Sequence, residues 1–234
     1  MSAIYKREMR AYFTSFSAYC FLAAFFAIEG FLFYVLYSNG STNVFAIPFG
    51  YPLYFTLFLV PVLTMRTISE DKRQKVDQVL LTAPISVSSV VMGKFWACMS
   101  IFGIAYAPTL IFQLIVSYLS TTNWLLYIYA LFGTMLLGAA IIAIGIFVSS
   151  LTESTALAAT LSIVVNIVIA FASSIAEMIG VDWITKAAKS IAMTDRYANF
   201  AESILSIPDI IYFISITAVF LFLCVRSVEK RRWA

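Results

Sequence analysis

Long apolar runs separated by short polar breaks dominate the chain, and they predict membrane-spanning helices. Charged side chains are absent from 11–28, 30–65, 95–152, 154–176 and 210–225. A span needs about 20 apolar residues, so the run at 95–152 is too long for one helix and must fold back. The polar cluster at 120–123, followed by Trp124, marks that turn, and a similar cluster at 38–43 divides the first long stretch.

The pattern therefore predicts an all-α integral membrane protein with six transmembrane helices. Their ranges are about 17–38, 51–67, 95–119, 124–149, 155–176 and 209–226. With the N-terminus inside, twelve of the fifteen basic residues fall on the inner side: Lys6, Arg7, Arg10, Arg66, Lys72, Arg73, Lys75, Lys94, Arg226, Lys230, Arg231 and Arg232. Only Lys186, Lys189 and Arg196 are outside, so the positive-inside rule predicts that both termini are cytoplasmic.

The composition excludes several classes of protein. Hydrophobic residues make up 62% of the chain, charged residues 12%, and the mean hydropathy is +0.94. A soluble domain of this size could not bury so much apolar surface, so a soluble enzyme, a disordered chain and a nucleic-acid binder are excluded. The chain has no histidine, which excludes His-based triads and zinc–His sites. Its three cysteines lie in or beside apolar runs and are expected to be buried hydrophobes.

The N-terminal residues 3–16 have the pattern of a helix lying on the membrane surface. Aromatic and apolar side chains share one predicted face, and basic side chains the other. The first set is Tyr5, Met9, Tyr12, Phe13 and Phe16, and the second is Lys6, Arg7 and Arg10. We expect the basic face to contact lipid headgroups. The alternative is a simple extension of the first span.

The predicted cytoplasmic loop 66–94 combines dense charge with an apolar stripe. Glu70 and Asp71 open the charged part, and Val79 and Leu80 belong to the stripe. Pro84 breaks the helical pattern, Ser86 can cap a second short helix at 87–92, and Gly93 is expected to end it. An ordinary solvated loop would not need the apolar residues. The loop is therefore predicted to dock on a cytoplasmic protein.

The predicted outer segment 177–208 mixes charges with apolar residues such as Trp183 and Ile191. Short interfacial or re-entrant helices and an ordinary extracellular loop are both compatible with it.

Glu29 is the one ionisable residue well inside a predicted span. Burying a carboxylate is costly unless it is paired with a cation, protonated or in contact with water, so Glu29 is a candidate pathway or gating residue. Snorkelling to the interface, or a protonated carboxyl bonded to a neighbouring helix, is the structural alternative.

Small and hydroxylated residues recur every four positions in the fifth predicted span. They are Ser154, Ala158, Ser162, Asn166, Ala170 and Ser174. This pattern favours close helix packing, with a dimer seam as one option, and Asn166 is expected to bond across the contact. Alternatively, Ser162 and Asn166 line a pathway.

No catalytic, cofactor or metal site is predicted in this chain. A phosphate-binding P-loop is absent, because Gly93-Lys94 is followed by Phe95 and no glycine-rich turn precedes it. Ser69 and Lys72 match a nucleophile pattern by spacing only, in a wet, charged loop.

Several motifs together resemble the permeases of the ABC-2 exporter family, particularly its gliding-motility-associated branch. The motifs are YKRE at 5–8, VPVLTMR at 60–66, VLLTAPIS at 79–86 with GK at 93–94, AIGIFVSSLT at 143–152 and VEKRRW at 228–233. The resemblance implies a six-helix permease with an elbow helix at 3–16 and a coupling helix in the first cytoplasmic loop. It also implies short re-entrant helices at 177–208 and a location in a prokaryotic cytoplasmic membrane.

For the partners, the resemblance implies two copies of an ATP-binding subunit and a second copy of this permease or a homologous one. ATP and Mg²⁺ would be bound by the ATP-binding subunit. The residues expected to couple the two are Glu70, Asp71, Val79, Leu80, Pro84, Ser86 and Gly93. Membrane lipids are the other expected partner. Three alternatives are a force-transmitting or assembly subunit, a secondary transporter and an intramembrane enzyme; the last two lack the buried ionisable residues they would need.

Overall fold

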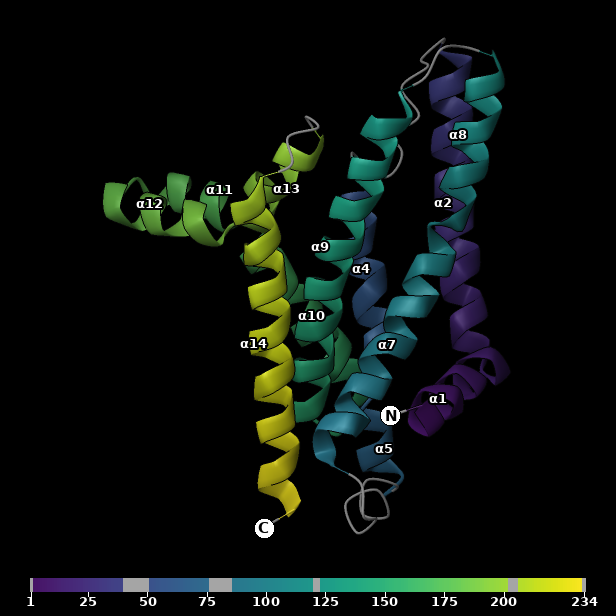
Figure 1. Ribbon diagram of the computed structural model, residues 1–234. Coiled ribbons are helices and arrows are strands. Elements are labelled where there is room, and N and C mark those ends of the chain that lie inside the picture. Colours follow the sequence, from purple (N-terminus) through teal and green to yellow (C-terminus); the bar gives the residue numbers. More distant parts are fainter. Residues whose placement is uncertain (1, 40–50, 76–85, 120–122, 202–205, 233–234) are drawn as a thin grey trace.

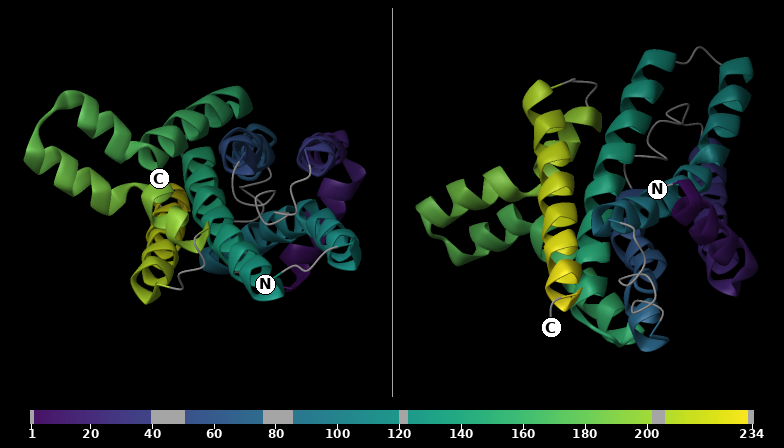
Figure 2. Two further views of the ribbon diagram at one scale, coloured as in Figure 1. Left: turned by 90° about the horizontal axis from the view of Figure 1, so that it is seen from above. Right: turned by 60° about the horizontal axis from the view of Figure 1, so that its bottom comes forward.

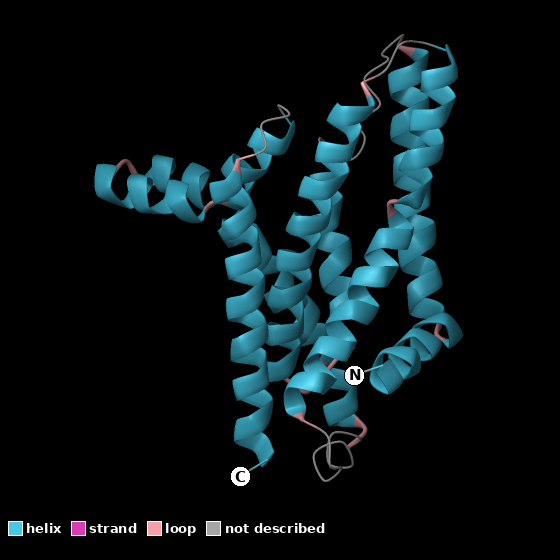
Figure 3. Cartoon of the chain, viewed as in Figure 1, coloured by secondary structure: helices cyan, strands magenta, loops and turns pink. Residues whose placement is uncertain are grey.

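The computed structural model describes residues 2–39, 51–75, 86–119, 123–201 and 206–232. Within these ranges the chain forms helices joined by short turns, and Figure 3 shows this all-helical character. The all-α class predicted from the sequence is therefore confirmed.

The long helices run side by side as a bundle (Figure 1). They are α2 (Phe16–Ser38), α4 (Tyr51–Thr64), α7 (Val87–Ala105) with α8 (Ala107–Leu119), α9 (Trp124–Leu151), α10 (Thr155–Ala170) and α14 (Ile207–Arg232). Two smaller helices, α1 (Ser2–Thr14) and α5 (Ser69–Arg73), lie at one end of the bundle. Both chain termini are at this same end, as Figure 1 shows.

Four helical stretches are long and apolar enough to cross a membrane: Ala18–Ser38, Val87–Leu119, Trp124–Leu151 and Ile207–Lys230. A fifth is added if α10 and α11 (Ala172–Ile179) form one span, although they are bent by 68°. Helix α4 has 14 described residues and falls short of this length. The described residues therefore give four or five candidate spans where the sequence pattern predicted six.

The bend between α10 and α11 divides the span predicted at 155–176. The hydroxyl of Thr194 donates a hydrogen bond of 2.6 Å to the carbonyl of Ala170, the last residue of α10. A carbonyl at a helix end needs a partner, and here a side chain from elsewhere in the chain supplies it. The bend is thus fixed by a contact that the local sequence does not reveal.

Helix α9 is the centre of the bundle and packs against α14, α10, α4, α7 and α13 (Met193–Ala201). The view along the bundle in Figure 2 shows it surrounded by other helices. Glycines allow this close packing: a Cβ atom at Gly138 would lie 2.1 Å from Cε1 of Phe102, and one at Gly145 would lie 2.2 Å from Oγ1 of Thr64. Asn123 caps the first turn of α9 by accepting from the amides of Leu125 and Leu126.

Helices α11 and α12 (Asp182–Ile191) project sideways from the bundle (Figure 1). Gly180 ends α11 with a φ of 73°, a left-handed conformation that suits glycine. An ion pair of 3.1 Å between Lys189 and Glu177 joins the two helices, and Trp183 is 73% exposed on α12. The segment 177–208 thus contains short helices in its described part. Their interfacial or re-entrant position stays a prediction.

Candidate functional site

The elbow helix α1 packs on α7, and its buried side chains are Ile4, Glu8 and Tyr12. Of the predicted aromatic face, Tyr12 is buried, whereas Phe13 at 37% and Phe16, the first residue of α2, at 82% are exposed on the surface of the molecule. The buried face also holds the acidic Glu8, which was not part of the predicted apolar face and which has a buried partner on α7.

That partner is Lys94, whose side chain is 3% exposed. Its Nζ lies 3.1 Å from Oε1 of Glu8 and 2.6 Å from Oδ2 of Asp71, and it also donates to the carbonyl of Thr67. One buried ammonium group therefore joins the elbow helix, α5 and the first turns of α7. We call Glu8, Asp71 and Lys94 the Lys94 node. Buried ions require such pairing, because each loses several kcal/mol of hydration.

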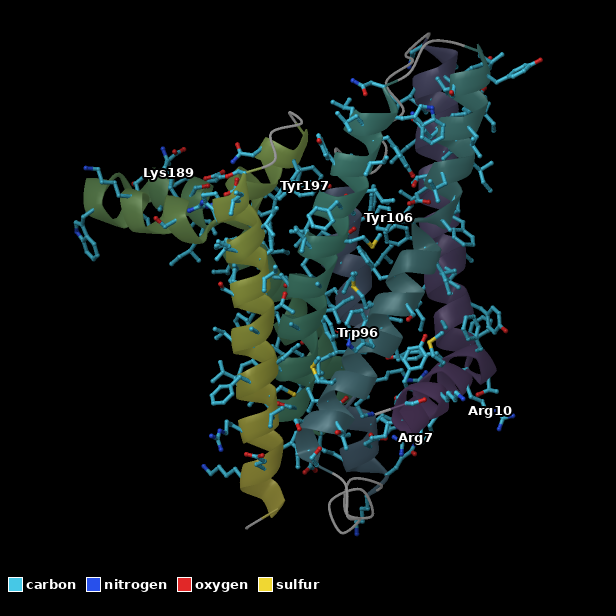
Figure 4. All side chains as sticks on the ribbon, in the orientation of Figure 1. Arg7, Arg10, Trp96, Tyr106, Lys189 and Tyr197 are labelled. Atoms are coloured by element: carbon cyan, nitrogen blue, oxygen red, sulfur yellow. The ribbon has the colours of Figure 1, made fainter. Side chains whose placement is uncertain are left out.

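Arginine residues flank the Lys94 node. The Arg7 guanidinium lies 2.6 Å from Glu8 and 3.7 Å from Asp71, so it faces the node and not the lipid headgroups expected for it. Partial burial alone would lower the pKa of Arg7, but its hydrogen bond to Glu8 and the charges of Glu8 and Asp71 raise the pKa. Figure 4 shows Arg10 pointing away from the bundle, on the side predicted for headgroup contact.

A groove of about 500 Å³ opens beside the Lys94 node. It is lined by residues of α1 and of the α4–α5 region, including Arg7, Tyr12, Arg66, Glu70, Asp71 and Gln74. Arg66 crosses it, with Nε 2.9 Å from Glu70 and Nη1 3.2 Å from the hydroxyl of Ser15. The predicted coupling residues Glu70 and Asp71 thus turn their charges toward their own chain.

Helix α5 is also tied to the end of α9. The Ser149 hydroxyl accepts from the amides of Ile68 and Ser69 at 3.2 and 3.0 Å and donates to the carbonyl of Met65 at 3.1 Å. Lys72 donates to the carbonyl of Ser150. These bonds satisfy backbone groups where α4 gives way to α5, and they attach the central helix to the same region.

The C-terminal part of the predicted loop 66–94 does not form the separate short helix expected at 87–92. Helix α7 begins after Ser86 and runs without interruption through Gly93 to Ala105, so Gly93 does not end a short helix. Ser86 occupies the N-cap position, but its hydroxyl bonds to Ser89 and caps no backbone amide. Val79, Leu80 and Pro84 lie outside the described residues.

Gly93 has a packing role: a Cβ atom there would lie 2.9 Å from Cγ2 of Ile4 on α1. We expect Gly93→Ala to push α1 away and to destabilise the protein by about 1–3 kcal/mol through overpacking. Thermal unfolding of the purified chain and protease sensitivity of α1 measure this. Gly30→Ala, where a Cβ meets nothing within 4 Å, is the control. If Ile4→Ala fails to relieve the defect, the contact is not its cause.

The structure buries Glu29 completely in α2. This excludes the snorkelling alternative, and neither carboxyl oxygen has a hydrogen-bond partner among the described residues.

In α10 the small-residue stripe is buried at Ala158, Ser162, Asn166 and Ala170. The stripe is covered within this chain, where α10 packs on α9 and α4, so it does not form a dimer seam. Asn166 donates a hydrogen bond of 2.8 Å to the carbonyl of Ser162 in its own helix, whereas a hydrogen bond to a neighbouring helix was expected.

Neither Glu8 nor Lys94 stands out in the sequence as a site residue. The available signal was their position: Glu8 lies four residues from both Ile4 and Tyr12, and Lys94 directly precedes a long apolar run. Glu8 and Lys94 are separated by 86 residues along the chain, so no local sequence pattern could predict that they pair.

The fold and this site define a multi-pass helical membrane protein whose N-terminal helix α1 is joined to α5 and α7 by buried ion pairs. A family model described as ABC-2 family transporter protein matches residues 2–232. The chain therefore belongs to the ABC-2 transporter family and is an ABC transporter permease, the membrane component that works with an ATP-binding subunit. No curated protein matches the chain.

Proposed function

We propose that the chain is the permease half of an ABC exporter in a prokaryotic cytoplasmic membrane, with six spans and both termini in the cytoplasm. Two permeases, identical or homologous, would pair with two ATP-binding subunits that hold ATP and Mg²⁺. The shared end of both termini in Figure 1 supports an even number of crossings. Membership in the gliding-motility branch stays a prediction.

The observation that carries this proposal is the Lys94 node. It joins the elbow helix, α5 and α7 through buried ion pairs, and Ser149 adds the end of α9. A force applied to the coupling loop 66–94 would therefore move α1, α7 and α9 together. Glu70 and Asp71 act here as positioning residues for the loop, while the apolar Val79 and Leu80 are proposed to contact the ATP-binding subunit.

A double truncation tests the docking part of the proposal. Val79→Ala with Leu80→Ala is expected to weaken binding of the ATP-binding subunit by on the order of 1–3 kcal/mol, because apolar anchors dominate such contacts. Co-purification of a candidate ATP-binding subunit expressed with this chain, together with ATP turnover of the complex, measures the effect. The control is Leu125→Ala with Ile128→Ala, which truncates exposed apolar residues near the start of α9.

Two results would contradict the proposal. One is unchanged assembly and turnover in the Val79/Leu80 variant. The other is saturable ATP hydrolysis by the isolated chain, which has no phosphate-binding loop. A force-transmitting subunit, the second candidate, predicts ATP turnover in the complex with no transport into vesicles.

A further inference from the structure

Polar side chains from several helices meet inside the bundle, toward the end opposite the termini. They are Glu29 of α2, Thr56 of α4, Tyr106 between α7 and α8, Thr109 and Gln113 of α8, and Tyr127 of α9, each at most 2% exposed. Tyr106 is visible in Figure 4 between the helices. Polar groups in an apolar membrane bundle are costly to bury, so such a gathering indicates a site.

The hydroxyl groups of this gathering satisfy one another, but the carboxyl does not take part. Thr56 bonds to Tyr106 at 3.0 Å, and Thr109 bonds to Tyr127 at 2.6 Å. Glu29 lies on the same face of α2 as Phe25, whose ring meets Tyr106 at 5.1 Å, so the carboxyl is on the side of α2 that packs toward these hydroxyl groups. Among the described residues, however, no hydrogen bond or ion pair reaches either Glu29 oxygen. A fully buried polar group without a partner needs an explanation, and a ligand supplies one.

Aromatic rings lie on both sides of Glu29 along α2. Phe25 and Phe33 are one turn before and after it, on the same helix face. The Phe25 ring meets Tyr106 edge-on at 5.1 Å, and Phe33 stacks on Phe112 at 4.5 Å. One carboxyl between aromatic rings suits an ammonium group, which pairs with the charge and is attracted to ring faces. It does not suit Ca²⁺, which takes about 6–8 oxygen ligands.

We propose that Glu29, with the rings of Phe25 and Tyr106, binds the ammonium group of an otherwise apolar amine. This names the substrate class of the permease and rests on the function proposed above. Without the amine, the buried carboxyl holds a proton, since an unpaired charge there would cost several kcal/mol. When the ammonium binds, that proton passes to water and a carboxylate–ammonium pair remains. Tyr106 and Tyr127 are the titratable side chains of this gathering on the described parts of the neighbouring helices.

Labelling by dicyclohexylcarbodiimide tests the site in the full chain in lipid nanodiscs. This apolar reagent adds to protonated carboxyl groups, and mass spectrometry locates the adduct. Without amine, we expect an adduct on Glu29. With hexylammonium chloride at about ten times its Kd, labelling should slow roughly tenfold, because little free site remains. Hexanol, which has the same apolar chain, and sodium chloride at equal concentration should not protect.

Two variants sharpen the test. Glu29→Gln keeps the shape of the side chain, and should lose the adduct and retain thermal stability. Phe25→Leu keeps the carboxyl and removes a ring; it should still be labelled, with protection weakened by about 3–10-fold through loss of the cation–π contact.

An unlabelled Glu29, no protection by hexylammonium, or equal protection by hexanol or sodium chloride would overturn the ammonium site. These measurements need no ATP-binding subunit. A failed site with intact assembly and ATP turnover would leave the permease proposal standing. A protected site in a chain that binds no ATPase would refute only the permease proposal.

Discussion

Lys94→Met is expected to be the most damaging single substitution outside the membrane core. It leaves the carboxylates of Glu8 and Asp71, whose side chains are only 10% and 20% exposed, without their buried cation, and only the more exposed Arg7 remains near them. Breaking one partner of a buried ion pair costs about 3–5 kcal/mol, mainly because the remaining charge is desolvated. Thermal unfolding of the purified chain should show the loss, and the elbow helix should become sensitive to protease.

The matched control is Arg226→Met, which breaks an exposed ion pair with Glu229 at 3.2 Å. Surface pairs contribute at most about 1 kcal/mol, so little change is expected. Adding Glu8→Gln to Lys94→Met should restore part of the stability, because one of the stranded charges is removed. A Lys94→Met variant as stable as the Arg226→Met control would show that the Lys94 node does not hold the elbow helix in place.

The second large effect is expected at Gly138 in the central helix. The Gly138→Ala methyl group would lie 2.1 Å from a ring atom of Phe102, whose side chain is fully buried. The ring cannot move freely, because it packs edge-on against Tyr106 at 4.9 Å and Phe25 at 6.3 Å. We expect a loss of about 3 kcal/mol from overpacking, at the upper end of its usual range. Thermal unfolding measures it.

Gly103→Ala is the control for this helix contact, since its Cβ meets nothing within 4 Å. There the substitution should stabilise α7 by about 0.5–1 kcal/mol through reduced backbone entropy in the unfolded chain. Combining Gly138→Ala with Phe102→Leu should recover stability, because the smaller side chain leaves room for the methyl group. A Gly138→Ala protein that unfolds like the wild type would mean that α7 and α9 do not approach as closely as described.

The site was predictable only in outline. The sequence indicated that the segment before Lys94 combines a charged cluster with an apolar stripe. It also identified Glu70, Asp71 and Glu29 as candidate site residues. It could not show that Asp71 pairs with Lys94, or that Glu29 has no hydrogen-bond partner within the described part of the chain, because both facts depend on helices brought together from distant parts of the chain. For the same reason the stripe at Ser162 and Asn166 could not be assigned to an internal contact in advance.

The class of the protein and the rough position of its long helices can be predicted from the amino-acid sequence alone. Charge-free runs are sufficient for this because, in a bilayer, a helix satisfies every backbone hydrogen bond locally. The positions where those helices bend, the face of α1 that packs on α7 and the pairing of the buried charges are visible only in the folded molecule. The carbonyl of Ala170 bonds to Thr194, and Glu8 bonds to Lys94, across separations of 24 and 86 residues. Such contacts depend on three-dimensional packing, which periodicity along the chain does not encode.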